Sequence, residues 1–228
     1  SKTHIKVALD TVKQQSIAVY GRPSLPSTYD DDFRPRLLLS KKGNIYFNVI
    51  SRDRKKMDIC VADIETGEVK VLIEERMNTY IESRDLVLLY DETQMIHWSE
   101  RDGWAHFYRY NADGSLRNRI TRGTFHSEAV SGVDEKSGML YFTAHGVQPG
   151  IDPYYEHLYA VSLNGGTPKA LHPGDFTASS RPSDNHKYFV SNFSRVNTVP
   201  KSELRNASGQ LVLDLETADL SALFAAGY

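Results

Sequence analysis

The chain has 228 residues, with 27 Lys and Arg against 29 Asp and Glu for a formal net charge of −2; 40% of the residues are hydrophobic and 25% are charged. This composition is typical of a globular protein with a sizeable core, in one large domain or two small ones. A charge near zero excludes the basic surface that nucleic-acid binding needs, and no apolar run is long enough to span a membrane. The single cysteine, Cys60, excludes an internal disulfide and any CxxC metal or redox motif.

The N-terminal region predicts strands. The chain does not begin with Met, and its first residues lack the apolar segment of a signal peptide. Apolar residues alternate with polar ones at Ile5, Val7 and Leu9, and again at Ile17 and Val19. This alternation predicts two strands of a structural unit whose beginning is absent.

From residue 34 onward the sequence repeats at a period of about 45 to 50 residues. Each unit has a leading strand, an aromatic or apolar strand, a further strand, a tight turn with glycine, and a last strand. The predicted leading strands are Arg36 to Leu39, Thr79 to Tyr90, Glu128 to Val133 and Thr177 to Arg181; the second strands contain Tyr46, Ile96, Tyr141 and Phe189; the third strands contain Ile59, Phe107 and Leu158; the turns contain Gly67, Gly114, Gly165 and Gly209.

Four antiparallel strands in about 45 residues form one blade of a β-propeller. A β-sandwich also has short, regularly spaced strands, but it does not predict the second, longer period. The predicted fold is therefore all-β, a partial β-propeller of about four four-stranded blades with a short C-terminal helix. We predict an incomplete blade at residues 1–33, blades at residues 34–76, 77–125, 126–176 and 177–215, and a linker helix at residues 216–228 with Leu220, Leu223 and Phe224 on one face.

Motifs for catalysis, metal binding and cofactor binding are absent from the sequence. It contains no Gly-x-Ser-x-Gly, His-Glu-x-x-His, Walker A or Gly-x-Gly-x-x-Gly segment. His97, His106 and His157 lie in predicted strands, where a hydrogen-bonded structural role is the simpler interpretation. Cys60 is expected in the core. We therefore predict no catalytic, metal-binding or cofactor-binding residue, and no cofactor.

Three acidic segments are candidate sites. Asp30 to Asp32 lie in a loop rich in turn residues and are expected to be solvated, and Glu74 and Glu75 follow a strand, where mixed charge is usual on a surface. Glu100 and Asp102 belong to a different kind of segment, because it joins two strands of one blade. An Arg and an Asp also occur at the same place in the preceding unit, so we interpret Arg101 and Asp102 as an architectural ion pair or a turn-fixing carboxylate.

The segment Trp98 to Tyr110 reads W-S-E-R-D-G-W-A-H-F-Y-R-Y. It resembles a blade hairpin of the propeller in the dipeptidyl-peptidase IV-like branch of the prolyl oligopeptidase family of serine peptidases, with bacterial members most similar. The resemblance covers roughly residues 35–227. The residues that carry it are Trp98, Ser99, Glu100, Arg101, Asp102, Gly103, Trp104, His106 and Tyr108, with further agreement in the segments 120–123, 134–142, 153–159 and 187–200.

The resemblance implies that the catalytic Ser, Asp and His lie in an α/β-hydrolase domain that follows the propeller and is not part of this chain. The chain is then a non-catalytic propeller fragment of a serine exopeptidase that releases N-terminal dipeptides, with Pro or Ala preferred second. Its role is to gate access to the active site and shape it, and its partners in the parent are the hydrolase domain and the peptide substrate. The resemblance is also compatible with a periplasmic or secreted parent. The family's substrate-binding glutamate pair has no convincing match, and Glu74 and Glu75 are not assigned that role.

A propeller that acts alone as a binding module for protein or glycan, with no attached enzyme, is the alternative. A downstream segment like Gly-Trp-Ser-Tyr-Gly-Gly in the parent reading frame would decide between the two. Open blade edges predict self-association through residues 5–19 and 186–213, or closure by pairing of residues 5–9 with the last blade. We also expect at least one of Trp98 and Trp104 to be buried between blades.

Overall fold

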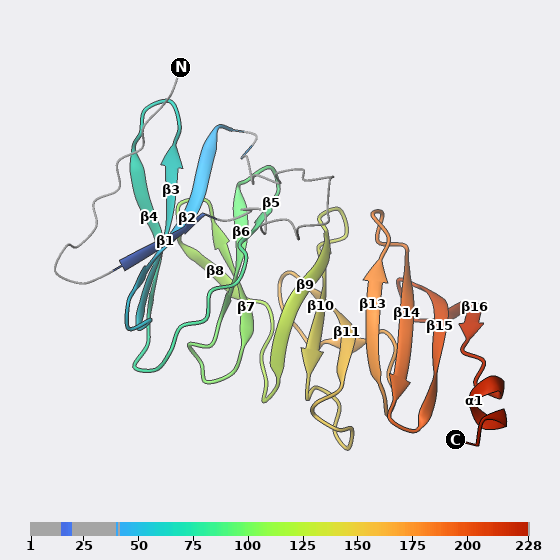
Figure 1. Ribbon diagram of the computed structural model, residues 1–228. Helices are drawn as coiled ribbons and strands as arrows, with labels where there is room; N and C mark the ends of the chain where they lie inside the picture. Colours follow the sequence, from blue (N-terminus) through green and yellow to red (C-terminus); the bar gives the residue numbers. More distant parts are fainter. Residues whose placement is uncertain (1–14, 20–39, 41, 228) are drawn as a thin grey trace, which may run out of the picture. The chain divides into compact units, whose positions relative to one another are not determined.

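The computed structural model describes residues 15–19, 40 and 42–227. In this part of the chain sixteen strands form four sheets of four strands each, followed by one short helix (Figure 1). Within every sheet the hydrogen-bonded order of the strands follows their order in the sequence. Such antiparallel four-stranded units are propeller blades, so the predicted all-β fold and its repeat are confirmed.

The four sheets have the following strands. The first contains β1 (Gln15–Val19), β2 (Asn44–Ser51), β3 (Lys56–Asp63) and β4 (Val69–Arg76). The second contains β5 (Val87–Leu89), β6 (Gln94–Ser99), β7 (His106–Asn111) and β8 (Leu116–Arg119). The third contains β9 (His126–Asp134), β10 (Met139–His145), β11 (Glu156–Ser162) and β12 (Lys169–Ala170), and the fourth contains β13 (Thr177–Pro182), β14 (Tyr188–Arg195), β15 (Thr198–Asn206) and β16 (Leu211–Thr217).

The first sheet differs from the sequence prediction. Its leading strand is β1, which pairs antiparallel with β2 from Gln15 opposite Ser51 to Val19 opposite Phe47. The segment predicted for this position, Arg36 to Leu39, lies outside the described residues, as do residues 5–9 and Asp30 to Asp32. Alternation alone showed that residues 17–19 form a strand, but not which strand it pairs with.

The C-terminal helix is shorter than the sequence pattern indicates. α1 comprises Ser221–Ala225 and has no buried residue. Leu223 and Phe224 are 44% and 62% exposed. No helix in the described part of the chain is long and apolar enough to cross a membrane.

The glycine in three of the four hairpin turns lies against the last strand of the preceding sheet. A Cβ at Gly114 would lie 2.1 Å from the carbonyl oxygen of Leu72, and one at Gly209 would lie 2.4 Å from that of Leu171. At Gly165 the distance to the carbonyl oxygen of Arg119 would be 3.2 Å. These glycines also have positive φ, so both the turn conformation and the close approach of two sheets favour glycine. The sequence indicated only the turn conformation, because the approach of a neighbouring sheet is not visible in a local pattern.

Replacing Gly114 by alanine should therefore destabilise the protein more than the same change at Gly67. Gly67 has a positive φ of 75° but no atom within 4 Å of an added Cβ, so Gly67→Ala should cost about 1 kcal/mol from backbone strain alone. At Gly114 the added methyl group also overlaps the Leu72 backbone, which should raise the loss to about 2 to 3 kcal/mol. Urea denaturation of both variants measures the difference, and equal losses would contradict the packing role of Gly114.

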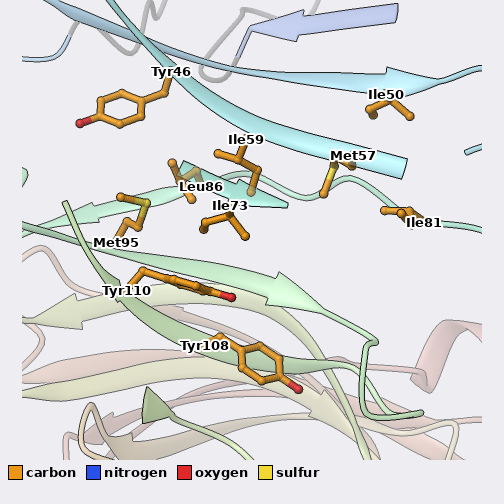
Figure 2. Close-up of a cluster of buried hydrophobic side chains, with 10 residues drawn as sticks. All are labelled: Tyr46, Ile50, Met57, Ile59, Ile73, Ile81, Leu86, Met95, Tyr108 and Tyr110. Atoms are coloured by element: carbon orange, nitrogen blue, oxygen red, sulfur yellow. The ribbon is translucent and has the colours of Figure 1, made fainter. Parts of the chain in front are cut away.

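By its internal contacts the chain divides into two units: Ser1–Gly103 with Tyr108–Asn118, and Trp104–Phe107 with Arg119–Tyr228. The first unit is organised around the buried cluster that Figure 2 shows, in which side chains of the first sheet meet those of β6, of β7 and of the segment that precedes β5. The second contains a buried cluster of Tyr141, Leu158, Ala160, Leu171 and Phe189. The cluster in the first unit comprises Tyr46, Ile50, Met57, Ile59, Ile73, Ile81, Leu86, Met95, Tyr108 and Tyr110.

Candidate functional site

A buried carboxylate in the first unit gathers several residues of the Trp98 to Trp104 motif. Glu75, on β4, is 3% exposed and accepts hydrogen bonds from the Ser99 hydroxyl at 2.5 Å and from Nη2 of Arg101 at 2.7 Å. Nε2 of His97 lies 3.0 Å from the same carboxylate. His97 and Ser99 belong to β6, so the group joins the first sheet to the second. We call Glu75, His97, Ser99 and Arg101 the Glu75 cluster.

Glu75 is ionised and His97 is neutral in this arrangement. Burial alone would raise the pKa of Glu75, but the hydrogen bonds from His97 and Ser99 and the charge of Arg101 outweigh it and hold that pKa at about 2. Burial lowers the pKa of His97 more strongly than the neighbouring carboxylate raises it. Because an ionised carboxylate only accepts hydrogen bonds, the proton of the neutral imidazole lies on Nε2.

Arg101 closes the cluster towards solvent. Its side chain is 28% exposed, and its guanidinium carbon lies 4.6 Å from the centre of the Tyr108 ring. Its Nε also donates to the Ser99 hydroxyl at 3.0 Å. Every polar group of the cluster therefore has a partner, which is the condition under which a buried ion pair is tolerated.

The position of Glu75 corrects the sequence interpretation, which placed Glu74 and Glu75 together on a mixed-charge surface. Glu74 is exposed as expected, but Glu75 points into the protein two residues after the buried Ile73. In a strand, residues i and i+2 share a face, so this alternation was the available signal. Arg101 forms an ion pair, but with Glu75 of the first sheet and not with Asp102 of its own segment as the sequence suggested.

The remaining motif residues of the first unit form hydrogen bonds, turns and packing contacts within the fold. Asp102 accepts a hydrogen bond from the Tyr108 hydroxyl at 2.5 Å, and Gly103 turns the chain at a φ of 85°. Glu100 is half-buried, and its backbone carbonyl accepts from the Gly103 amide at 2.8 Å. Trp98 is 3% exposed, with the guanidinium of Arg84 5.1 Å from its ring. The prediction that one motif tryptophan is buried is thus confirmed.

In the second unit, Trp104 is 44% exposed and His106 is completely buried. Nδ1 of His106 lies 3.1 Å from Thr121 Oγ1, and its Nε2 lies 3.1 Å from the carbonyl oxygen of Gly123. His157 makes the equivalent contact one repeat later, with Nε2 3.1 Å from the carbonyl oxygen of Gly174. Each histidine thus contacts the backbone of the segment that follows the last strand of its sheet, as expected for a structural residue.

A third polar group has the residue types of a catalytic triad, Ser, His and Glu, but with the two ring nitrogens exchanged and without accessibility. Nδ1 of His172 lies 2.8 Å from Ser191 Oγ, and its Nε2 lies 3.6 Å from Oε2 of Glu203, which Arg205 also contacts at 2.6 Å. Ser191 has no exposed surface and His172 is 4% exposed. A nucleophile must reach an external carbonyl carbon, so this serine cannot act on a substrate in the folded state.

The cysteine is also enclosed. Cys60 is buried, and burial together with the nearby Asp58 raises its pKa to about 11, which keeps it a thiol. Within the described ranges no three His, Cys, Asp or Glu side chains are grouped so that they could hold a metal ion. The Glu75 cluster and the His172 group can therefore fix adjacent sheets. Two His–Glu pairs of the third sheet are more open: His126 with Glu128 at 2.9 Å and His145 with Glu156 at 3.5 Å, with side chains between 27% and 33% exposed.

Comparison with known proteins gives one consistent family. The family model "Dipeptidyl peptidase IV (DPP IV) N-terminal region" matches residues 3–200. The dipeptidyl peptidase 4 of Trichophyton rubrum is 28% identical over 137 residues, which are 56% of this chain and 16% of that protein. That of Arthroderma otae is 36% identical over 66 residues, which are 29% of this chain and 8% of that protein.

The crystal structure of Porphyromonas gingivalis dipeptidyl peptidase 4 matches with a TM-score of 0.67 and 21% sequence identity, over 81% of this chain and 26% of that one. At this identity the likeness shows the fold, a β-propeller of which the four sheets are blades. The chain thus spans a small part of each of these relatives. Because the family model matches most of its residues, this chain belongs to the family of the dipeptidyl peptidase IV N-terminal region.

Proposed function

We propose that this chain is the non-catalytic propeller part of a dipeptidyl-peptidase IV-like serine exopeptidase. The observation that carries the proposal is the match of residues 3–200 to the N-terminal region of such peptidases. In this proposal an α/β-hydrolase domain of the parent supplies the Ser, Asp and His, and the enzyme releases dipeptides with Pro or Ala in the second position. The propeller gates access of the peptide and completes the active site.

The polar clusters support a scaffold role within each unit. The Glu75 cluster fixes β4 of the first sheet to β6 of the second, and His172 with Ser191 and Glu203 fixes the end of the third sheet to the fourth. Buried networks with every member satisfied rigidify and specify a core. Rigid blades are what a domain needs if it is to admit some peptides and exclude others.

The purified chain should not hydrolyse Gly-Pro or Ala-Pro chromogenic dipeptides. Acyl transfer needs an accessible serine activated by a positioned base, and Ser191, the serine that contacts a histidine at 2.8 Å, is fully buried. Turnover that a serine-directed inhibitor abolishes would contradict the proposal, and Ser191→Ala would then show whether this serine is responsible.

The second candidate is a stand-alone binding module. The two candidates differ in what the parent gene should encode downstream of this chain. The peptidase proposal requires a Gly-Trp-Ser-Tyr-Gly-Gly-like segment downstream in the same reading frame. Expression of the chain together with that downstream part should yield dipeptidyl peptidase activity. A parent frame without the segment would favour the binding module.

A further inference from the structure

A cavity lies between the first and second sheets, and every residue that lines it belongs to the first unit. Its volume is about 760 Å³, within the range of about 300 to 1,000 Å³ that is typical of small-molecule sites. On the side of the first sheet, Tyr46 lies opposite Val61 and Val61 lies opposite Lys70, so the three residues form a row across β2, β3 and β4. Two turns of the second sheet form the other side, and the Ala112 amide joins them by donating to the Thr93 carbonyl at 2.9 Å.

The hydroxyl group of Tyr46 gives the first indication of a ligand. Tyr46 lines the cavity but is only 4% exposed, because its ring packs into the buried cluster. Figure 2 shows its hydroxyl pointing away from the other labelled side chains. Among the described residues none forms a hydrogen bond with this hydroxyl. A polar group that is nearly removed from water is unfavourable without a partner, so a ligand with a polar group is favoured next to it.

The charge of the lining indicates which polar group this is. Four carboxylates and two lysines line the cavity, so its formal charge is −2. Each lysine already lies near a carboxylate, Lys70 at 3.3 Å and Lys42 at 3.7 Å. Burial, and after it the charge of the nearby Glu92, raises the pKa of the Tyr46 hydroxyl. A cation is therefore favoured beside Glu92 and Tyr46.

The backbone at Glu92 is a third observation. Glu92 has a φ of 64°, and the two residues before it also have positive φ, which is unfavourable for residues with a side chain. At the corresponding place in the first and third sheets, three residues before the buried tyrosine, the chain has Gly43 and Gly138. The turn itself therefore does not require a carboxylate. The Ser40 hydroxyl donates to the Glu92 carboxylate and fixes it at the edge of the cavity.

We propose that this cavity binds an aliphatic ammonium, supplied by a free diamine or by a lysine side chain of a peptide. The ammonium donates to the Glu92 carboxylate and the Tyr46 hydroxyl, and the aliphatic stem lies on Val61 and Leu72, which are partly buried. An ammonium has three donors and no acceptor, which suits two acceptors side by side, and its methylene groups gain from leaving water. This inference does not depend on the proposed function.

Isothermal titration calorimetry of the whole chain tests the two sources separately. The probes are 1,5-diaminopentane and Nα-acetyl-lysine amide, and binding of either one supports the proposal and identifies the source. Pentane-1,5-diol has the same stem without charge, and glutarate has negative groups in place of the ammoniums, so neither should bind. If neither amine binds, or if the diol binds as tightly as the diamine, the proposal is wrong.

Two variants locate the ligand. Glu92→Gln should weaken binding of the amine by at least about tenfold, because a hydrogen bond to a charged group is lost. Tyr46→Phe removes only the hydroxyl and should weaken binding by about threefold to tenfold. Since this hydroxyl has no partner among the described residues, the melting temperature of Tyr46→Phe should not fall. Binding that is unchanged in both variants, with circular dichroism showing that they are folded, would place the amine elsewhere.

The third sheet provides the matched control. Tyr141 occupies the place of Tyr46, and His186, whose ring stacks on it at 5.5 Å, occupies the place of Glu92. These residues line a second cavity, between the third and fourth sheets, in which three carboxylates balance three lysines. Tyr141→Phe should therefore leave binding of the amine unchanged. If Tyr141→Phe weakens binding as much as Tyr46→Phe does, the carboxylate of Glu92 does not select the ligand.

Discussion

Glu75→Ala should lower the free energy of unfolding by about 3 to 5 kcal/mol. The change removes the carboxylate that accepts from Ser99 and Arg101 and contacts His97. Ser99 and His97 are 3% and 1% exposed, so water cannot replace the lost acceptor without opening the contact between the first two sheets. Each buried polar group left without a partner costs about 1 to 3 kcal/mol. Chemical denaturation at neutral pH measures the loss.

The neighbouring residue provides a matched control. Glu74 has the same side chain on the same strand, but it is exposed, and its ion pair with Arg76 at 3.7 Å is a surface pair. Glu74→Ala should therefore change the unfolding free energy by about 0.5 kcal/mol or less. A loss at Glu75 that is no larger than the loss at Glu74 would show that the cluster does not hold the two sheets together.

The repeat made most of the fold predictable from the sequence. Strand β13 (Thr177–Pro182) falls on the predicted Thr177 to Arg181, and β9 (His126–Asp134) contains the predicted Glu128 to Val133. These strands were found because turn glycines and apolar residues recur together, and such local patterns depend only on neighbouring residues. The pairing of β1 with β2 was not found, because it joins segments separated by a long connection and no local pattern specifies such a partner.

The candidate site was predictable only in part for a related reason. The recurrence of an Arg and an Asp in this hairpin suggested an ion pair of Arg101 within its own segment, but its partner is Glu75, 26 residues away on the first sheet. Residue type alone does not distinguish Glu75 from Glu74. Strand alternation does, because Glu75 shares a face with the buried Ile73 and Glu74 does not. The Ser191, His172 and Glu203 group could not be anticipated at all, because its members come together only when the fourth sheet folds against the third.

Stability should fall as the pH is lowered from about 7 to about 4.5, before the carboxylates are protonated. Burial is the main cause that lowers the pKa values of His97, His157 and His172, and that of His172 falls to about 4. In the unfolded chain these side chains titrate near 6.5. At pH values between the unfolded pKa and the lower native pKa, the unfolded state binds protons that the native state does not bind. Acid therefore favours unfolding in this range. Glu75, whose native pKa is about 2, adds its own loss only below about 4.5.

The His172→Gln variant isolates one of these contributions. Glutamine cannot take up a proton, so the variant should lose less stability than the unmodified chain on going from about pH 7 to about pH 4.5, with a difference on the order of 2 kcal/mol. At about pH 8 His172 is neutral in both the native and unfolded states. The stability difference between the two proteins at that pH therefore gives the packing or hydrogen-bond cost of the substitution, which is subtracted from the differences at lower pH. Urea denaturation at the three pH values gives the slopes. If the slopes of the two proteins are equal, His172 is not buried in its neutral form, and the contact between its imidazole and Ser191 does not persist in solution.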